Sequence, residues 1–174
     1  MFIYVQSTGE VYEQPGIVPV AHKIATLSAP AKLLGIGYSG HGAGRNNPSM
    51  EDVHNIGPIP CGVYMISKPE CVTPAPPGPH GPYIMRLSPV GHNSLGRSGF
   101  LIHGDNVHHD ASQGCIILLY TVRLHIGTSV AHILTVVSAI KKIDMWHENL
   151  DPKSSEVTKE KESVITVAEN PLPA

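Results

Sequence analysis

The amino-acid sequence predicts a mainly β fold, a small β-sandwich or barrel-like sheet with one or two short helices. Glycine (17 residues) and proline (16 residues) are abundant in the 174-residue chain, which is typical of short elements joined by many turns. Segments rich in β-forming residues recur between these turn signals, and the composition disfavours long helices. We expect one domain over residues 1–147, followed by a polar extension over residues 148–174.

The first third of the chain begins with a hairpin signal, in which "FIYVQ" and "VYEQPG" flank the turn "STGE". The next segment, "AHKIATLSAPAKLLGIGYSG" (residues 21–40), is apolar enough for a strand in one part and suits a short helix in another. Residues 40–62 are rich in Gly, Asn and Pro, so we expect a long surface loop of the kind that often carries function.

The remainder of the domain is predicted to contain further strands with elaborate loops between them. The segments "VYMIS" (63–67) and "YIMRLSPV" (83–90) indicate a meander, and "GRSGFLIHG" (96–104) indicates a buried strand that ends in polar residues. The segment "GCIILLY" (114–120) fits either the next strand or the start of a short helix. The β-branched residues of "ILTVVS" (133–138) favour a final strand.

Charge and hydropathy argue against two classes of partner. A formal net charge of -2 gives no electrostatic footprint for nucleic acid, and no apolar stretch is long enough to span a membrane. The start, "MFIYVQSTGE", lacks the basic and apolar regions of a secretory signal peptide. We therefore expect synthesis in the cytoplasm, and a route other than a signal peptide if the protein acts outside it.

The three cysteines are Cys61, Cys71 and Cys115. Cys61 and Cys71 flank a Pro-rich segment, and they are either small buried residues or, in an oxidising compartment, partners in a disulfide. Cys115 stands alone in "GFLIHGDNVHHDASQGCIIL" (99–118), a stretch that also holds three histidines, two aspartates and a serine between two apolar runs. This stretch is the strongest candidate for chemistry in the chain.

Cys115 and His103 have the properties of a nucleophile and its base. A cysteine attacks as a thiolate, which requires a nearby base or fixed dipoles to lower the pKa of the thiol. Gly114 permits unusual backbone angles, and a turn at "SQGC" would expose backbone N–H groups of the kind that form an oxyanion hole. His103 ends the apolar run "FLIH", so it should be held rigidly at the edge of a strand, and the loop that follows is long enough to fold back toward the thiol.

The motif "IHG", followed by a short loop and "SQGCI", resembles the active-site signature of L,D-transpeptidases of the YkuD type. The wider sequence is similar to the type VI secretion L,D-transpeptidase effector family, whose members are toxins delivered into a competitor's periplasm. Motifs that carry this similarity occur in the same order over roughly residues 4 to 120: "YVQSTGEV", "GYSGHGAGRNNP", "GPIPCGVYMI", "MRLSP" and "GRSGFLIHGDN" before "SQGCIIL".

The resemblance implies a role for individual residues. Cys115 would attack the carbonyl between meso-diaminopimelate and the terminal D-Ala of a tetrapeptide stem, and His103 would be the general base. His108 or His109 could also reach the thiol, but His103 is preferred because it ends a strand and begins the "HG" motif. The backbone N–H groups of Gly114 and Cys115 would hold the oxyanion, with Ser112 and Gln113 in the wall of the site. From the residues alone, Arg97 is a candidate contact for a substrate carboxylate. Tyr38 and Asn47 are candidates for the cleft wall, although a capping or turn role is the more common one for such residues.

The resemblance also has implications for cofactors, partners and location. The chemistry needs no metal and no organic cofactor. The partners implied are the peptidoglycan stem peptide, a periplasmic immunity protein that plugs the cleft, and a component of the secretion machine, with action in the target cell's periplasm. The sequence departs from the broader transpeptidase pattern at Gln113 and Ile117, where typical members have His before the Gly-Cys pair and Arg or Asn shortly after the Cys.

Two other functions remain open from the residues alone. A metal-dependent hydrolase could use ligands from the same stretch, although the spacing matches none of the usual helical or paired motifs; these ligands would be His103, Asp105, His108, His109 and Cys115. A noncatalytic wall-binding module would have kept the fold and lost the reaction. The presence of both Cys115 and His103 argues against that module.

Overall fold

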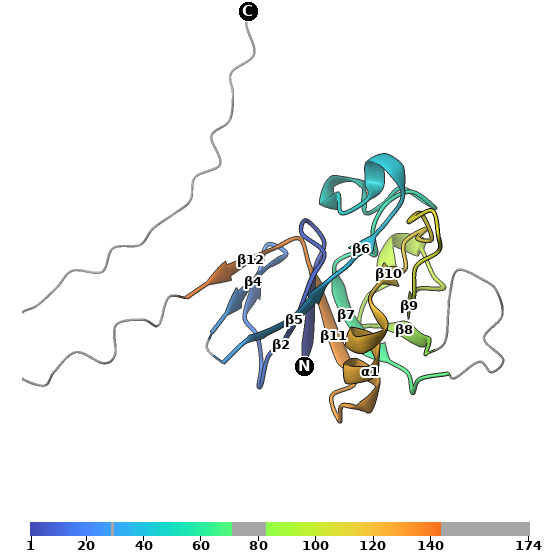
Figure 1. Cartoon of the computed structure of the whole chain (residues 1–174). Coiled ribbons are helices and arrows are strands. Elements are labelled where there is room, and N and C mark those ends of the chain that lie inside the picture. The colour runs from blue at the N-terminus through green and yellow to red at the C-terminus, as the bar shows by residue number, and fades with distance from the viewer. Residues whose placement is uncertain (29, 71–82, 144–174) are drawn as a thin grey trace, which may run out of the picture.

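Most of the regular structure in the computed structural model is β-strand, which confirms the predicted class (Figure 1). The structure describes residues 1–28, 30–70 and 83–143. Its main sheet has nine strands, and their order across the sheet is β5 (Lys32–Ile36), β2 (Glu10–Glu13), β1 (Phe2–Val5), β11 (Ile133–Val137), β7 (Gly62–Ile66), β8 (Met85–Val90), β9 (Leu101–His103), β10 (Ile116–Ile117) and β6 (Tyr38–Ser39).

The two edge strands of this sheet are neighbours in the sequence, and this connection curls the sheet into a nearly closed barrel. Only Gly37 separates β5 from β6. The backbone N–H of Gly37 donates to the Gly9 carbonyl at 2.8 Å, and a Cβ added at Gly37 would lie 1.9 Å from the Ile117 carbonyl oxygen. The chain can therefore pass from β2 to β10 only because residue 37 has no side chain.

A second, three-stranded sheet lies beside β1, β2 and β11. It consists of β12 (Ala139–Lys142), β4 (Ile24–Leu27) and β3 (Val20–Ala21), and it occupies one side of the molecule in Figure 1. Apolar side chains from both sheets form a small core between them: Ile3, Val5, Tyr12, Val18, Ala25, Leu27 and Val137. Because side chains alternate along a strand, β1 contributes to this core with one face and to the barrel interior with the other.

The barrel interior holds the larger core, and the one α-helix of the described residues packs against it. This helix, α1 (Tyr120–Thr128), places Val122 and Ile126 in that core. Within the described ranges, three short 3-10 turns occur in loops, namely η1 (Gly42–Gly44), η2 (Pro48–Met50) and η3 (Ser94–Gly96). No helix in the described part of the chain is long and apolar enough to cross a membrane.

Several element predictions can be compared with the structure. The N-terminal hairpin is confirmed, since β1 and β2 pair antiparallel. In segment 21–40 the described residues form β4, β5 and β6 without the short helix that the pattern allowed. The segment "GCIILLY" contains both of the predicted alternatives, β10 and then the first residue of α1, and β11 is followed by one further strand, β12. The predicted extension over residues 148–174 lies outside the described residues.

Replacing Gly37 with alanine should strongly destabilise the barrel. The new Cβ would meet backbone atoms that cannot rotate away, so we expect the free energy of unfolding to fall by about 3 kcal/mol. Urea unfolding followed by circular dichroism would measure this loss. Gly16→Ala is the matched control, because Gly16 has a positive φ and open space around it, and it should cost only about 1 kcal/mol. Equal losses in the two variants would contradict the steric argument.

Candidate active site

The pairing of β9 with β10 brings the predicted nucleophile and base to one face of the sheet. The two strands run parallel, with Ile116 opposite Ile102 and Ile117 opposite His103. Ile102 and Ile116 belong to the barrel core, so His103 lies on the opposite face of β9. Continuing the register by one residue sets Cys115 beside Leu101, on that same face and diagonal to His103.

His103 is fully buried, and its Nδ1 lies 2.7 Å from the carbonyl oxygen of Gly104. A carbonyl only accepts hydrogen bonds, so in the neutral ring the proton resides on Nδ1. The basic lone pair is then on Nε2, which is the atom that can take a proton from a thiol. The contact with Gly104 also fixes the orientation of the ring.

Cys115 is half-buried, and its environment opposes spontaneous ionisation. Burial raises the pKa of the thiol, while the backbone N–H of Leu101 and the positive charge of Arg97 lower it by less than burial raises it. The sulfur lies 3.9 Å from the carbonyl oxygen of Gly99. A thiol in this setting is mostly protonated at neutral pH and needs a base to become a nucleophile.

Arg97 is a buried cation at the back of this site, with a relative exposure of 5%. Its guanidinium donates to the carbonyl oxygens of Glu51 and Pro58 at 2.6 Å, of Gly57 at 2.9 Å and of Gln113 at 3.3 Å. These bonds tie the loop of residues 40–62 to the turn that carries Cys115. Carbonyl groups do not neutralise the guanidinium, so its charge still acts on the thiol. The substrate contact predicted for Arg97 stays a prediction.

Ser112 holds the turn before Cys115 together. Its Oγ donates to the Cys115 carbonyl at 2.6 Å and accepts from the backbone N–H of Gly40 at 2.8 Å and of Gly114 at 3.1 Å. The N–H of Gly114, one of the two donors predicted for an oxyanion hole, is therefore engaged by Ser112. The adjacent Gln113 is exposed.

Gly114 adopts a backbone conformation that favours glycine, with φ at +122°. A Cβ at this position would lie 2.4 Å from Nη2 of Arg97, so the close approach of the guanidinium also requires glycine. The Gly114 carbonyl accepts from Ser39 Oγ at 2.9 Å, and that same Oγ accepts from the N–H of Ile59 at 2.8 Å. Sequence reasoning missed Ser39, although it lies in the motif "GYSG" that contributed to the family resemblance.

Tyr38, on β6, binds the loop that follows His103 at two points. Its hydroxyl donates to Asp105 Oδ1 at 2.5 Å and accepts from the backbone N–H of Ala111 at 3.2 Å. The other carboxylate oxygen of Asp105 lies 2.8 Å from His109 Nδ1. Burial alone would raise the pKa of Asp105, but the hydrogen bonds from Tyr38 and His109 outweigh it and hold this pKa below its usual value.

Arg45 also contacts Tyr38 and the loop that follows His103, and sequence reasoning missed it. Its guanidinium carbon lies 3.7 Å from the centre of the Tyr38 ring, and Nη1 donates to the His109 carbonyl at 2.9 Å. Arg45 is part of the quoted loop "GAGRNNP", but no pattern in the sequence indicates that it stacks on an aromatic ring.

Two pockets lie near β9, one toward its first residue and the other at the residues that follow its last. The first, of about 250 Å³, is lined by residues before and within β9, with β8 opposite: Arg86, Leu87, Ser88, Pro89, Ser98, Gly99, Phe100 and Leu101. The second, of about 440 Å³, begins at Gly104 and Asp105, directly after His103, and is also lined by Tyr38, Arg45 and Arg123. The lining residues of the two pockets thus precede and follow His103 along the chain, while His103 and Cys115 themselves are in neither lining.

Asn47 has a local structural role in the described contacts. Its side-chain oxygen accepts from the N–H of Ser49 at 3.2 Å and from Ser49 Oγ at 2.7 Å, which caps η2. Its amide nitrogen donates to the Ala43 carbonyl at 3.0 Å. Asn47 is not among the residues that line these two pockets, and its predicted substrate contact stays a prediction.

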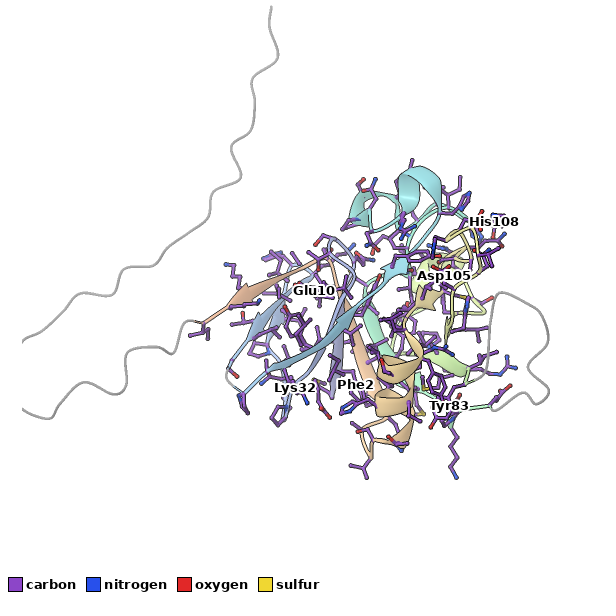
Figure 2. The ribbon with its side chains drawn as sticks, viewed as in Figure 1. Phe2, Glu10, Lys32, Tyr83, Asp105 and His108 are labelled. Carbon is purple, nitrogen blue, oxygen red and sulfur yellow. The ribbon has the colours of Figure 1, made fainter. Side chains whose placement is uncertain are left out.

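The metal hypothesis gains no geometric support from the part of the chain that the structure describes. Within residues 1–28, 30–70 and 83–143, no three His, Cys, Asp or Glu side chains come together as a group that could hold a metal ion. His108 is exposed, and Figure 2 shows it with Asp105 at the end of the molecule where the helical turns of residues 42–50 lie. His109 pairs with Asp105, whereas His103 is fully buried.

Cys61 differs from Cys115 in its surroundings. Its thiol donates to Gln6 Oε1 at 3.2 Å and lies 3.4 Å from Ser138 Oγ. Burial raises the pKa of Cys61 to about 12, so this thiol is unreactive at neutral pH. Cys71, with which Cys61 could pair in an oxidising compartment, lies outside the described residues, so that alternative stays open.

A family model described as the Tlde1 domain matches residues 35–140, which include both β9 and β10. The chain belongs to the Tlde1 domain family. This is the type VI secretion L,D-transpeptidase effector family 1, so the family resemblance is confirmed at this level. Membership indicates a type VI secretion effector with peptidoglycan-modifying activity. Comparison with curated proteins and with solved structures gave no significant match.

Removing the charge of Arg97 should slow alkylation of Cys115 in the Tlde1 domain. The guanidinium lowers the pKa of this thiol, so in Arg97→Met that pKa rises and less thiolate is present at any pH below it. We expect the rate of iodoacetamide labelling at pH 8 to fall several-fold and the pH profile to shift upward. Mass spectrometry of the labelled peptide would measure both.

Arg97→Lys is the control for this experiment, because it keeps the charge but loses the fork of hydrogen bonds. If the charge controls the thiol, Arg97→Lys retains most of the labelling rate. An unchanged pH profile in Arg97→Met, in protein that thermal unfolding shows to be folded, would contradict the electrostatic role.

Proposed function

We propose that this Tlde1 domain is a cysteine enzyme that cleaves the bond between meso-diaminopimelate and the terminal D-Ala of peptidoglycan tetrapeptide stems. It would act as an L,D-carboxypeptidase, an L,D-transpeptidase that exchanges the terminal D-amino acid, or both. The observation that carries the proposal is the β9–β10 register, which pairs Ile117 with His103; continued by alternation to residue 115, it puts Cys115 on the same face as His103. Family membership supports the class of substrate.

The first half of the reaction uses one proton and breaks one bond. Nε2 of His103 takes the proton of the Cys115 thiol, and the thiolate attacks the carbonyl carbon. The C–N bond to D-Ala then breaks, and the imidazolium returns the proton to the leaving amine. The acyl group remains on Cys115 as a thioester.

The oxyanion that forms during attack needs backbone donors. The N–H of Cys115 is the donor we assign first, because the N–H of Gly114 is bonded to Ser112 and would have to leave it to contribute. Ser112 and Gln113 form the adjoining wall. The positive charge of Arg97 behind the turn also favours the anionic states of the sulfur.

The molecule that attacks the thioester decides which product forms. Water would release a tripeptide stem, whereas the amine of a D-amino acid or of another stem would give exchange or a cross-link. Delivery by a type VI secretion machine would place this reaction in the target cell's periplasm. A producing cell would then need an immunity protein, which could block the cleft around Cys115.

Cys115→Ala should abolish trimming of tetrapeptide stems. Without the sulfur no thioester can form, so we expect activity below about one thousandth of wild type. His103→Gln should reduce activity by about a hundredfold or more, because the thiol would lack its base. Muropeptide analysis by liquid chromatography and mass spectrometry, after incubation with purified sacculi, would measure both losses.

Cys61→Ala is the matched control, since it also removes one thiol but from a residue whose pKa is near 12. It should retain wild-type activity. Tetrapeptides left unchanged by folded wild-type protein would refute the proposed enzyme, and binding to sacculi without any new muropeptide would favour a noncatalytic wall-binding module instead.

A further inference from the structure

We propose that the pocket beyond His103 binds the carboxylate of the D-amino acid on the leaving side of the scissile bond, with Arg45 as its main contact. This inference rests on the proposed function and deepens it, because it assigns a subsite to one part of the substrate. The pocket, of about 440 Å³, is lined by Tyr38, Arg45, Asp105 and Arg123, among others.

The position of this pocket relative to His103 decides which part of the peptide it can hold. A base that returns its proton to the leaving amine must lie on the side of the leaving group. Gly104 and Asp105 line the pocket and follow His103 directly along the chain. The acyl side of the peptide would then extend past Cys115 toward the other pocket, which is lined by Gly99 and Leu101.

The charges around the pocket favour an anion. Two arginines, Arg45 and Arg123, line it, and Asp105 is the one carboxylate among its lining residues. Asp105 accepts hydrogen bonds from Tyr38 and from His109, which stabilise its negative charge, and the two guanidinium groups still outnumber this one carboxylate. The N-terminal end of α1 also borders the pocket and has no acidic residue in its first turn, which adds to the positive potential.

The two arginines contribute differently. Arg123 is buried, with 4% relative exposure, and donates to the carbonyl oxygens of Leu118 and Tyr83. Arg45 is exposed, and stacking on the Tyr38 ring orients its planar guanidinium. Its Nη1 donates to His109, while a guanidinium has five N–H donors and binds carboxylates through two parallel bonds. Arg45 is therefore the residue best placed to contact a ligand.

Binding to the full chain with Cys115→Ala tests this site without any reaction. The probes are the tetrapeptide L-Ala-D-Glu-meso-diaminopimelate-D-Ala and the same peptide with its terminal carboxylate converted to a carboxamide. Isothermal titration calorimetry should show that the amide binds about tenfold more weakly, the loss expected for one charge-assisted hydrogen bond. Adding Arg45→Met should remove this difference, because the partner of the carboxylate is then absent.

Lys141→Met is the matched control, since Lys141 is an exposed cation on β12 in the other sheet. It should keep the tenfold difference between the two peptides. Arg45→Lys should keep part of this difference. In Arg45→Met with the native cysteine present, the labelling rate of Cys115 should match wild type, which shows that the loops remain in place. Equal binding of acid and amide by the Arg45-containing protein, or an undiminished difference in Arg45→Met, would overturn the inference.

Free D-Ala and D-alaninamide, titrated by nuclear magnetic resonance, distinguish the two sources of the carboxylate. Arg45-dependent preference for free D-Ala would assign the pocket to the incoming amino acid of exchange as well as to the leaving residue. A preference seen only with the tetrapeptide would assign it to the leaving residue alone. Failure of the proposed enzyme would appear separately, as unchanged muropeptides with wild-type protein.

Discussion

The close packing of three backbone segments at Gly37 is the constraint on which the site depends. Gly37 touches Gly9 on one side and the Ile117 carbonyl on the other, so β5 can continue into β6 and reach the far edge of the sheet. This continuation pairs Tyr38 with Ile117 and Ser39 with Ile116. This pairing sets Ser39 and Tyr38 in place. Ser39 holds the turn before Cys115, and Tyr38 holds the loop after His103.

Polar groups around Cys115 mostly bind the backbone and do little to stabilise the thiolate directly. Ser112, Ser39 and Arg97 all bind carbonyl or N–H groups of the turn from residues 112 to 115. Burial of the thiol then outweighs the attraction of Arg97, so the resting state is the protonated one. Such a balance keeps the thiol from reacting indiscriminately and makes attack depend on the neighbouring imidazole.

Local patterns in the sequence were sufficient for the β class, the hairpin and the strands that follow the loops. They also suggested His103 and Cys115 as a candidate pair, which stays a prediction, because a polar or reactive residue at the end of an apolar run is visible without a structure. Arg45 and Ser39 could not be found in this way, since their contacts join segments far apart in the chain. For the same reason the pattern could not show that Arg97, a surface type of residue, is buried on backbone carbonyls. Strand β12 was missed because its ladder with β4 links distant segments.

The parallel pairing of β9 with β10 has a consequence for how such proteins can diversify. Parallel neighbours cannot be joined by a tight hairpin, so a long connection between the two strands is a geometric necessity. Residues 104–114 form this long connection on the outside of the barrel. Insertions or deletions in this connection would alter which molecules reach the site, while the strand register would keep the positions of Cys115 and His103. New specificities can therefore arise in this connection.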